Sequence, residues 1–500
     1  MAAPNAARAS MTSAMAVARG AAARGASPYE AAAVAAATHP RQLLLDTPVG
    51  LEKALERELE DLGIQGPRSR YRGGVALEAP PAALWRAALQ SRLLTAVRLG
   101  LGRPFHAAFE STLKNHAAGV NWMDYVVFGP DPVIPKIKVN VANSRLYHTA
   151  VVERAVTTAI EEQRQRYLHK KLQQTDDRSF YGQRGHRPPS ALRIFVDLQD
   201  DECQLSVAAT EVPHRRAYAY LNSTAEGMDT GCAGEEGTTL STMGSELGAP
   251  HAAACVLRAQ LLQHLEEAAA EGEELVVWDP FCGRGTMLLE ALGVALGAPP
   301  ASPAMRLPYA DFPNFDEMRY NQVVRELKIQ PHPRLRNLTL LGTHSDSDLV
   351  ETANAEFLNF VRTMPRPRLG ALSQLWSGAD DAGSGGSHGL PCKVTFLQAR
   401  TLADAVPELR GRPTLILTNV PYGNRAPAAC SFARRAYEEL GRVVRAGGRL
   451  RGVYCLSARE DFKRLSGLEW RTELRFQAAA ARVELLRWTG RAGPAAAAAA

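Results

Sequence analysis

Hydrophobic positions follow one order in the first half of the chain and another in the second half. Before residue 210, strand-like alternation (as at 136–141) and helical spacing succeed each other irregularly. This order predicts a small α/β unit that does not share a sheet with the rest of the chain. Its strands are expected at 42–46, 74–77, 93–102, 136–141, 193–197 and 204–209, and its helices at 50–62, 81–91, 110–120 and 151–172.

After His251, helical and strand-like segments alternate regularly. Regular alternation predicts an α/β domain of Rossmann-like type, in which helices cover both faces of a mostly parallel, twisted sheet. Ligands of such sheets bind at the carboxyl ends of the strands, near the point where the strand order reverses. Helices are expected at 252–270, 287–292, 349–360 and 430–444, and strands at 275–278, 339–342, 393–397, 414–417, 450–455 and 480–488.

Three polar stretches interrupt these patterns and are expected to be loops or flexible insertions. They are rich in Gly, Ser, Thr, Pro or charged residues, and have too little apolar surface to offset the entropy lost on ordering. The stretches are 174–190, 222–248 and 371–391.

Composition bounds the size of the protein and the classes of site it contains. Its 500 residues exceed one core, so two or three domains are expected. The 58 Lys and Arg against 52 Asp and Glu give a net charge of +6, which allows an RNA partner without requiring one. No apolar run approaches the roughly 20 residues of a membrane span. The 7 cysteines form no Cys-x-x-Cys pair, so neither a disulfide framework nor a metal site is expected.

The first forty residues differ from the rest of the chain. They are rich in Ala, carry Arg8, Arg19 and Arg24, and contain no acidic residue before Glu30. Such a composition resembles a transit peptide and predicts a chloroplast or mitochondrial protein. The alternative is an Ala-biased disordered tail on a cytoplasmic protein. The other end of the chain, 491–500, has the same bias and is expected to be disordered.

A glycine turn lies between an expected strand and an expected helix. It reads Asp-Pro-Phe-Cys-Gly-Arg-Gly-Thr and runs from Asp279 to Thr286. Gly283 and Gly285 allow a tight backbone path, and the N–H groups at the start of the following helix favour an anionic group. S-adenosylmethionine, with an amino-acid end and a nucleoside end, suits this turn, whereas a dinucleotide turn would have a third glycine in place of Leu288. The alternative is a turn that binds no ligand. The candidate cofactor-binding residues are Asp279, Pro280, Cys282, Gly283, Gly285 and Thr286.

A second loop, Asn-Val-Pro-Tyr-Gly beginning at Asn419, follows another expected strand. It has the form of the Asn-Pro-Pro-Tyr loop with which many methyltransferases hold a planar substrate that bears an amino nitrogen. The Asn419 side-chain oxygen and the Val420 carbonyl can accept hydrogen bonds from an exocyclic amine, which directs its lone pair at the methyl donor. Tyr422 can stack on an extruded base, and Pro421 fixes the loop. The alternative is a β-turn followed by a core tyrosine. The candidate catalytic residues are Asn419, Pro421 and Tyr422.

The two motifs in this order predict an S-adenosylmethionine-dependent N-methyltransferase. With them, the chain resembles the THUMP-containing RNA guanine-N2 methyltransferases, particularly the bacterial type that makes N2-methylguanosine in large-subunit ribosomal RNA. The resemblance runs from about Gln42 to Trp488, and the two motifs are its specific parts. Looser matches lie at 50–56, Asn121-Trp122, 144–149, 213–218 and 249–254.

This resemblance implies a ferredoxin-like plus THUMP RNA-binding region over 41–215 and a methyltransferase domain over 249–490. It further implies a monomer whose THUMP region binds RNA and delivers a base to the catalytic pocket. Basic side chains there would contact phosphates. For each of them a solvated surface residue is the alternative, and His148 is as readily a packed structural histidine. The basic candidates are Lys136, Lys138, Arg145, His148, Lys170, Lys171, Arg215 and Arg216.

Two acidic residues that the resemblance leads us to expect are missing. An Asp that hydrogen-bonds the ribose hydroxyls is expected where His344 stands, and Asp346 is the candidate that replaces it in cofactor binding. An acid near the amino group of adenine is expected close to Arg400, and Asp404 lies further along. These departures predict weaker cofactor binding, other contacts, or a lost active site.

The expected function is therefore methylation of the exocyclic N2 of guanosine, above all in large-subunit ribosomal RNA. One alternative is a catalytically inactive RNA-binding or ribosome-assembly protein of the same fold. Others keep the chemistry and change the acceptor to transfer RNA, adenine N6 in DNA, or a protein glutamine. The THUMP-like half argues against the last two.

Overall fold

The computed structural model describes residues 41–126, 128, 135–173, 192–210, 247–301, 307–327, 329–363, 390–423, 427–478 and 481–493. Several sequence predictions lie outside these residues: the transit segment 1–40, the stretch 174–190, nearly all of 222–248 and 371–391, and both Arg215 and Arg216. Among the described helices, none is long and apolar enough to cross a membrane.

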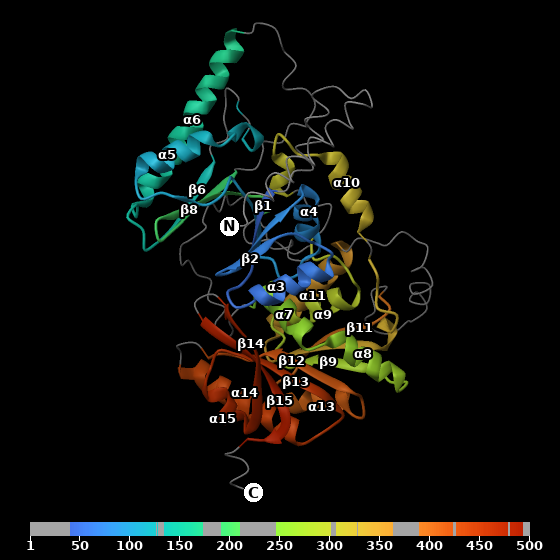
Figure 1. Cartoon of the computed structure of the whole chain (residues 1–500). Helices are drawn as coiled ribbons and strands as arrows, with labels where there is room; N and C mark the ends of the chain where they lie inside the picture. Colours follow the sequence, from blue (N-terminus) through green and yellow to red (C-terminus); the bar gives the residue numbers. More distant parts are fainter. Residues whose placement is uncertain are drawn as a thin grey trace.

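The N-terminal part of the described chain forms one eight-stranded sheet, separate from the later sheet as predicted (Figure 1). Its strands lie in the order β2-β3-β1-β4-β8-β7-β6, and β5 pairs with β8. Neighbouring strands are antiparallel except for β6 and β7. The strands are β1 (Arg41–Asp46), β2 (Arg68–Tyr71), β3 (Gly74–Ala79), β4 (Ala96–Gly100), β5 (Phe105–His106), β6 (Lys136–Ala142), β7 (Arg193–Gln199) and β8 (Glu202–Ala208), and the helices are α3 (Glu52–Asp61), α4 (Pro81–Gln90), α5 (Glu110–Gly119) and α6 (Thr149–Gln173).

The second half of the described chain forms a seven-stranded sheet in the order β11-β10-β9-β12-β13-β15-β14. The first five of these strands are parallel and β15 is antiparallel to both its neighbours, so the predicted mostly parallel α/β sheet is confirmed. From β9 the chain adds strands first on one side and then, from β12, on the other. The strands are β9 (Leu275–Asp279), β10 (Leu338–His344), β11 (Lys393–Gln398), β12 (Thr414–Asn419), β13 (Leu450–Ser457), β14 (Leu468–Ala478) and β15 (Ala481–Ala492), and the helices are α7 (Ala249–Arg258), α8 (Leu261–Ala270), α9 (Thr286–Ala295), α10 (Glu317–Glu326), α11 (Ser347–Thr363), α13 (Val406–Leu409), α14 (Pro427–Arg445) and α15 (Asp461–Ser466).

Some elements differ from the predictions. The helix expected at 252–270 is two helices, α7 and α8, because Gln260 between them has a left-handed backbone with φ of 54°. The strand β15 extends to Ala492, so its last two residues belong to the sheet rather than to a disordered tail. Hydrophobic spacing does not reveal β2, α10 or β14. Strand β2 consists of polar residues and a tyrosine, and helix α10 buries only Val323. Strand β14 is partly exposed along most of its length.

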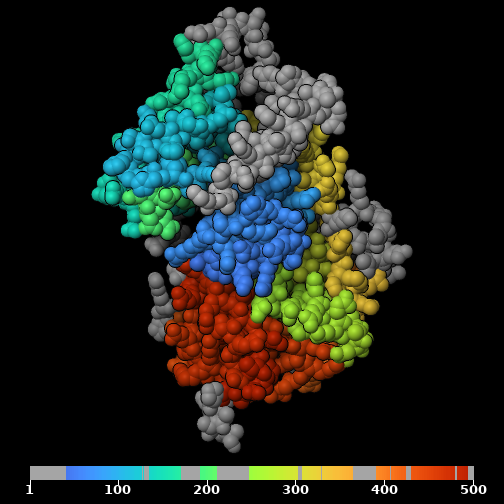
Figure 2. Space-filling view, viewed as in Figure 1, coloured from blue at the N-terminus to red at the C-terminus, as the bar shows by residue number. Residues whose placement is uncertain are grey.

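A buried ion pair connects the N-terminal unit to a helix of the second half of the chain. Glu58 on α3 accepts a hydrogen bond of 2.7 Å from the backbone N–H of Arg92, which fixes the loop that follows α4. From this loop Arg92 Nη1 reaches Glu290 on α9 at 3.1 Å, and the Glu290 side chain is 0% exposed. Arg92 also donates to the carbonyl of Ala298. The N-terminal unit is therefore anchored on α9, the helix that follows the glycine turn. Figures 1 and 2 show the blue part of this unit lying against the green and red segments of the second half of the chain.

Candidate active site

The glycine turn and the Asn419 loop lie at the carboxyl ends of neighbouring strands, where the strand order reverses. Asp279, the last residue of β9, is 1% exposed. Its Oδ1 accepts a hydrogen bond of 2.5 Å from the hydroxyl of Thr418 on β12 and another of 3.1 Å from the N–H of Phe281. Thr418 thus joins the two motifs. The sequence analysis missed it, although it immediately precedes Asn419.

The environment of Asp279 changes its acidity. Burial raises the pKa of Asp279 to about 7, although the hydrogen bonds from Thr418 and the Phe281 N–H act in the opposite direction. The side chain therefore holds its proton in mild acid and loses it around neutrality. A cationic group bound beside it would favour the carboxylate, so this position suits a ligand that carries an ammonium group.

We expect the free energy of unfolding of Asp279→Asn, measured relative to that of the wild type, to increase by about 3 kcal/mol between pH 5 and pH 8. The carboxyl ionises at 3.8 as a model compound and at about 7 in the fold. The folded protein thus holds a proton that the unfolded chain has lost, and its stability falls as the pH rises through this window. Asparagine cannot ionise and keeps an acceptor for Thr418. Chemical denaturation at three pH values measures the difference, and a pH-independent difference would contradict the prediction.

The two glycines of the turn have different neighbours. Both have positive φ, 51° at Gly283 and 81° at Gly285. A Cβ at Gly283 would meet no atom within 4 Å, whereas at Gly285 it would lie 2.9 Å from the ring of Phe396 on β11. Gly285 is also the N-cap of α9, whose first N–H groups lack partners within the helix. The absence of a side chain at Gly283 therefore leaves space for a ligand, whereas at Gly285 it leaves space for the Phe396 ring.

Alanine at these two positions should have unequal effects on stability. Gly283→Ala should cost about 1–2 kcal/mol, the price of a left-handed backbone with a side chain. Gly285→Ala should cost that amount plus about 1–3 kcal/mol for overpacking against Phe396. Denaturant unfolding of both variants tests this. Equal losses would show that the Phe396 ring moves aside freely.

Side chains from later elements hold the backbone of the Asn419 loop. Tyr437 on α14 donates a hydrogen bond to the carbonyl of Pro421. Arg459, which follows β13, donates from Nη1 to the carbonyl of Tyr422 at 3.2 Å. The sequence analysis missed Tyr437 and Arg459, because a local motif does not indicate which distant residues support it.

Within the loop, two predicted catalytic residues contact each other. The Tyr422 hydroxyl donates to Asn419 Oδ1 at 2.7 Å, and the tyrosine is only 6% exposed. Stacking of Tyr422 on a base therefore requires the ring to become uncovered, and it stays a prediction. This bond orients the amide of Asn419, whose oxygen, like any amide oxygen, has two lone pairs.

Asp346 and Asp404 lie near the two positions where acidic residues were expected, and both make hydrogen bonds to nearby backbone N–H groups. Asp346 Oδ1 accepts a hydrogen bond from the N–H of Asp348 at 2.9 Å and caps α11. Its predicted role in cofactor binding stays a prediction. The N–H of Asp346 donates to His344 Nδ1 at 3.1 Å, and burial lowers the pKa of His344, so this ring is neutral at pH 7. Beyond β11, Arg400 is exposed, and the exposed Asp404 accepts a hydrogen bond from the N–H of Thr401.

Known proteins resemble the chain in sequence and in structure. Residues 42–98 match the model of the RlmL ferredoxin-like domain. A Synechocystis protein named "Putative RNA methyltransferase slr0064" is 25% identical over 313 residues, covering 61% of this chain and 68% of that protein. The ribosomal RNA large subunit methyltransferase K/L of Methylococcus capsulatus is 24% identical over 411 residues, covering 81% of this chain but only 45% of the longer protein. The resemblance to RlmL/THUMP-type methyltransferases is confirmed.

A solved structure shows the same architecture. The crystal structure of SMU.472, complexed with SAH, matches with a TM-score of 0.61 and 16% identity over 91% of this chain and 99% of that one. Together with the strand order, this likeness shows a class I methyltransferase fold that follows a ferredoxin-like domain.

The predicted RNA-binding residues that the structure describes belong to the N-terminal unit, whereas both motifs belong to the second half of the chain. Lys136 and Lys138 are exposed on the same face of β6, the edge strand. Arg145 and His148 are exposed in the connection from β6 to α6, and the Arg145 side chain stays 73% exposed beside Asp201 at 3.5 Å. Contact with RNA stays a prediction. Lys170 is exposed near the end of α6, whereas the side chain of Lys171 lies outside the description.

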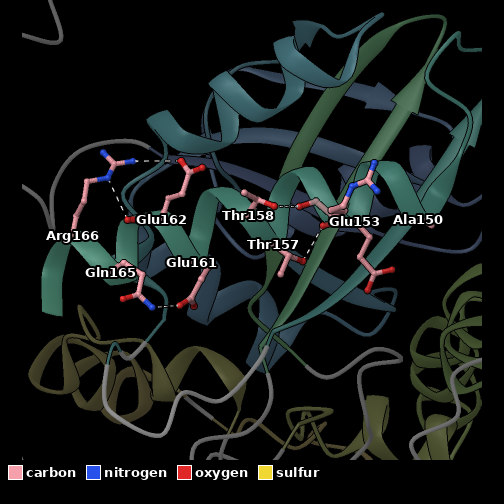
Figure 3. A pocket seen from close by; sticks show the side chains of 9 residues that line it. Ala150, Glu153, Thr157, Thr158, Glu161, Glu162, Gln165 and Arg166 are labelled. Carbon is pink, nitrogen blue, oxygen red and sulfur yellow. Dashed lines mark hydrogen bonds and ion pairs between the residues drawn. The ribbon is translucent and has the colours of Figure 1, made fainter. Parts of the chain in front are cut away.

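A cavity of about 820 Å³ follows one face of α6 and contains neither motif. Figure 3 shows that helix α6 alone supplies the residues that line it. Its polar side chains interact along the helix, as Arg166 does with Glu162 and Gln165 with Glu161. The lining is therefore the polar, solvated surface of a single helix. Among the described residues, no cluster of three or more His, Cys, Asp or Glu could hold a metal ion.

Proposed function

We propose that the protein is an S-adenosylmethionine-dependent RNA methyltransferase that modifies the exocyclic N2 of guanosine in large-subunit ribosomal RNA. The observation that carries the proposal is the hydrogen bond between Thr418 and Asp279. It brings a glycine turn and an Asn-Val-Pro-Tyr loop together where the strand order reverses, the usual ligand position in such sheets. The names of the curated relatives support RNA, and one of them the large ribosomal subunit, as the acceptor.

The residues around the turn fit this cofactor. The first N–H groups of α9 favour its carboxylate, and the buried Asp279 favours its ammonium group. The open space over Gly283 allows the backbone to approach it closely. When bound, the cofactor supplies a methyl group on a positively charged sulfur. The acceptor nitrogen would take up the methyl group together with the positive charge, and in that state it is acidic enough to release its proton to water without a strong base.

The Asn419 loop positions the acceptor. Asn419 Oδ1 and the Val420 carbonyl accept hydrogen bonds from the exocyclic amine, and Tyr422 stacks on the base once it is uncovered. The region 41–215 binds the RNA, with Lys136, Lys138, Arg145 and His148 at its phosphates. With residues 1–40 as a transit peptide, the reaction takes place in a chloroplast or mitochondrion.

Calorimetry and methyl transfer test this function. We expect the full chain to bind S-adenosylmethionine with micromolar affinity, Asp279→Ala to lose that binding, and Asn419→Ala to keep it. Nucleoside mass spectrometry of treated ribosomal RNA should detect N2-methylguanosine. Parallel reactions with transfer RNA, DNA and protein test the other acceptors. Absence of binding at high micromolar cofactor would refute the enzyme.

A non-catalytic RNA-binding protein is the second candidate, and His344 and Arg400 favour it. Neither provides the carboxylate expected at the ribose or the adenine, and Asp346 uses one oxygen to cap α11. RNA binding without cofactor binding would establish this candidate.

A further inference from the structure

A second cavity lies between the N-terminal unit and the segment that connects α9 to α10. Its volume is about 440 Å³, within the range of about 300–1,000 Å³ typical of small-molecule sites. Residues 307–316 of this segment and the helix α10 lie against α4. An exposed ion pair of 2.6 Å between Arg86 on α4 and Glu326 on α10 lies at the same contact. Both halves of the molecule therefore form the walls of this cavity.

Aromatic rings make up much of the lining. Trp85 comes from α4, and Tyr309, Phe312 and Phe315 come from the connecting segment. The ring centroids of Trp85 and Phe315 are 6.0 Å apart in an edge-on arrangement, and those of Tyr309 and Phe315 are 5.9 Å apart. The backbone N–H of Tyr309 donates to the carbonyl of Ala209 at 3.0 Å, which ties the segment to the N-terminal unit. Trp85, Tyr309 and Phe312 are only 3–5% exposed and form the apolar floor of the cavity. Phe315 is partly exposed, so its ring offers a flat ligand an accessible surface.

Polar groups also line the same cavity. The Tyr309 hydroxyl is buried and interacts with the Tyr320 side chain, but it makes no hydrogen bond of ordinary geometry among the described residues. A buried hydroxyl in this position calls for a further partner. Arg41 and Arg319 contribute guanidinium groups, and Arg319 Nε lies 3.5 Å from Asp316 Oδ2. The exposed Asn314 is part of the lining, so the cavity is reachable from solvent.

We propose that this cavity binds one unstacked nucleotide of the substrate RNA, distinct from the base that is methylated. Aromatic side chains beside guanidinium groups are the chemistry with which proteins bind single-stranded RNA, because the rings stack on the base and the cations contact phosphate. The Tyr309 hydroxyl provides a hydrogen bond to a polar edge of the base. The inference rests on the proposed function, since it takes RNA as the substrate. A nucleotide held here would fix the RNA on both halves of the protein at once.

Cross-linking and binding test the site without the cofactor. Ribosomal RNA fragments containing 4-thiouridine should cross-link, on irradiation, to peptides that include Trp85 or residues 309–319. We expect Phe315→Leu, which keeps apolar volume but removes the ring, to weaken RNA binding about tenfold. Arg41→Gln should reduce the salt dependence of binding by about one phosphate contact. Met318→Ala is the matched control, because Met318 is 84% exposed on α10 and is not part of the lining.

The outcomes separate this site from the catalytic proposal. Wild-type affinity in both Phe315→Leu and Arg41→Gln, or cross-links only to other peptides, would overturn the nucleotide site. Calorimetry with S-adenosylmethionine and methyl transfer by the wild type test the enzyme independently. Cofactor affinity should be unchanged in both variants, which also shows that they are folded.

Discussion

Asn419→Ala is expected to reduce the rate of methyl transfer by about 10²–10³-fold while leaving the affinity for S-adenosylmethionine unchanged. Asn419 is the last residue of β12, and Thr418 before it is bonded to the buried Asp279 beside the glycine turn. The amide oxygen is oriented by the hydroxyl of Tyr422 at 2.7 Å. An acceptor fixed in this way acts on the amine as its nitrogen gains positive charge, so its loss should affect kcat more than binding.

Tyr422→Phe is the matched control for that experiment. It keeps the aromatic ring and the hydrogen bond that the Arg459 side chain donates to the carbonyl of residue 422. It removes only the hydroxyl that orients Asn419. We expect a smaller loss of activity, about tenfold, because the Asn419 oxygen remains in place but is less well oriented. Single-turnover methyl transfer, measured at saturating cofactor, gives both rates. If Asn419→Ala retained the wild-type rate, the loop would have no role in holding the amine.

The hydrophobic pattern of the sequence predicted the central strands of the second sheet better than its edge strand β14. Strands β9 and β12 are apolar on both faces because helices cover both, and this leaves a continuous hydrophobic run in the sequence. Strand β14, at the edge, is partly exposed on both faces and leaves no such run. The kink at Gln260 was equally hidden, since α7 and α8 share the same apolar spacing and only the backbone conformation separates them.

The candidate site was predictable where its residues are adjacent in sequence. Asp279, Gly283 and Asn419 stand in motifs whose spacing carries their chemistry. Tyr437 and Arg459 act on the Asn419 loop from elements that follow it, and only the fold shows that they reach its carbonyls. Gly285 was predicted as a cofactor residue, and the structure adds a packing role against Phe396, a residue more than a hundred positions away.

Removing either partner of the ion pair between Arg92 and Glu290 should destabilise the protein by about 3–5 kcal/mol. The Glu290 side chain is 0% exposed and that of Arg92 is 11% exposed, so each single substitution leaves a charge in a poorly hydrated environment. Arg86 and Glu326 provide the matched control. They also join the two halves of the molecule, but their side chains are 41% and 44% exposed, and Arg86→Ala should cost less than about 1 kcal/mol.

The double variant Arg92→Met with Glu290→Leu distinguishes charge from packing. It removes both charges and keeps apolar volume. We therefore expect it to recover most of the free energy of unfolding that substitution of Arg92 alone or of Glu290 alone removes. Because α9 begins at the glycine turn, the single variants should also weaken cofactor binding, whereas Arg86→Ala should not. Denaturant unfolding and calorimetry on the same four proteins measure both effects. If Arg92→Ala cost no more than Arg86→Ala, the N-terminal unit would be held on α9 by apolar contacts alone, and the ion pair would have no part in fixing the turn.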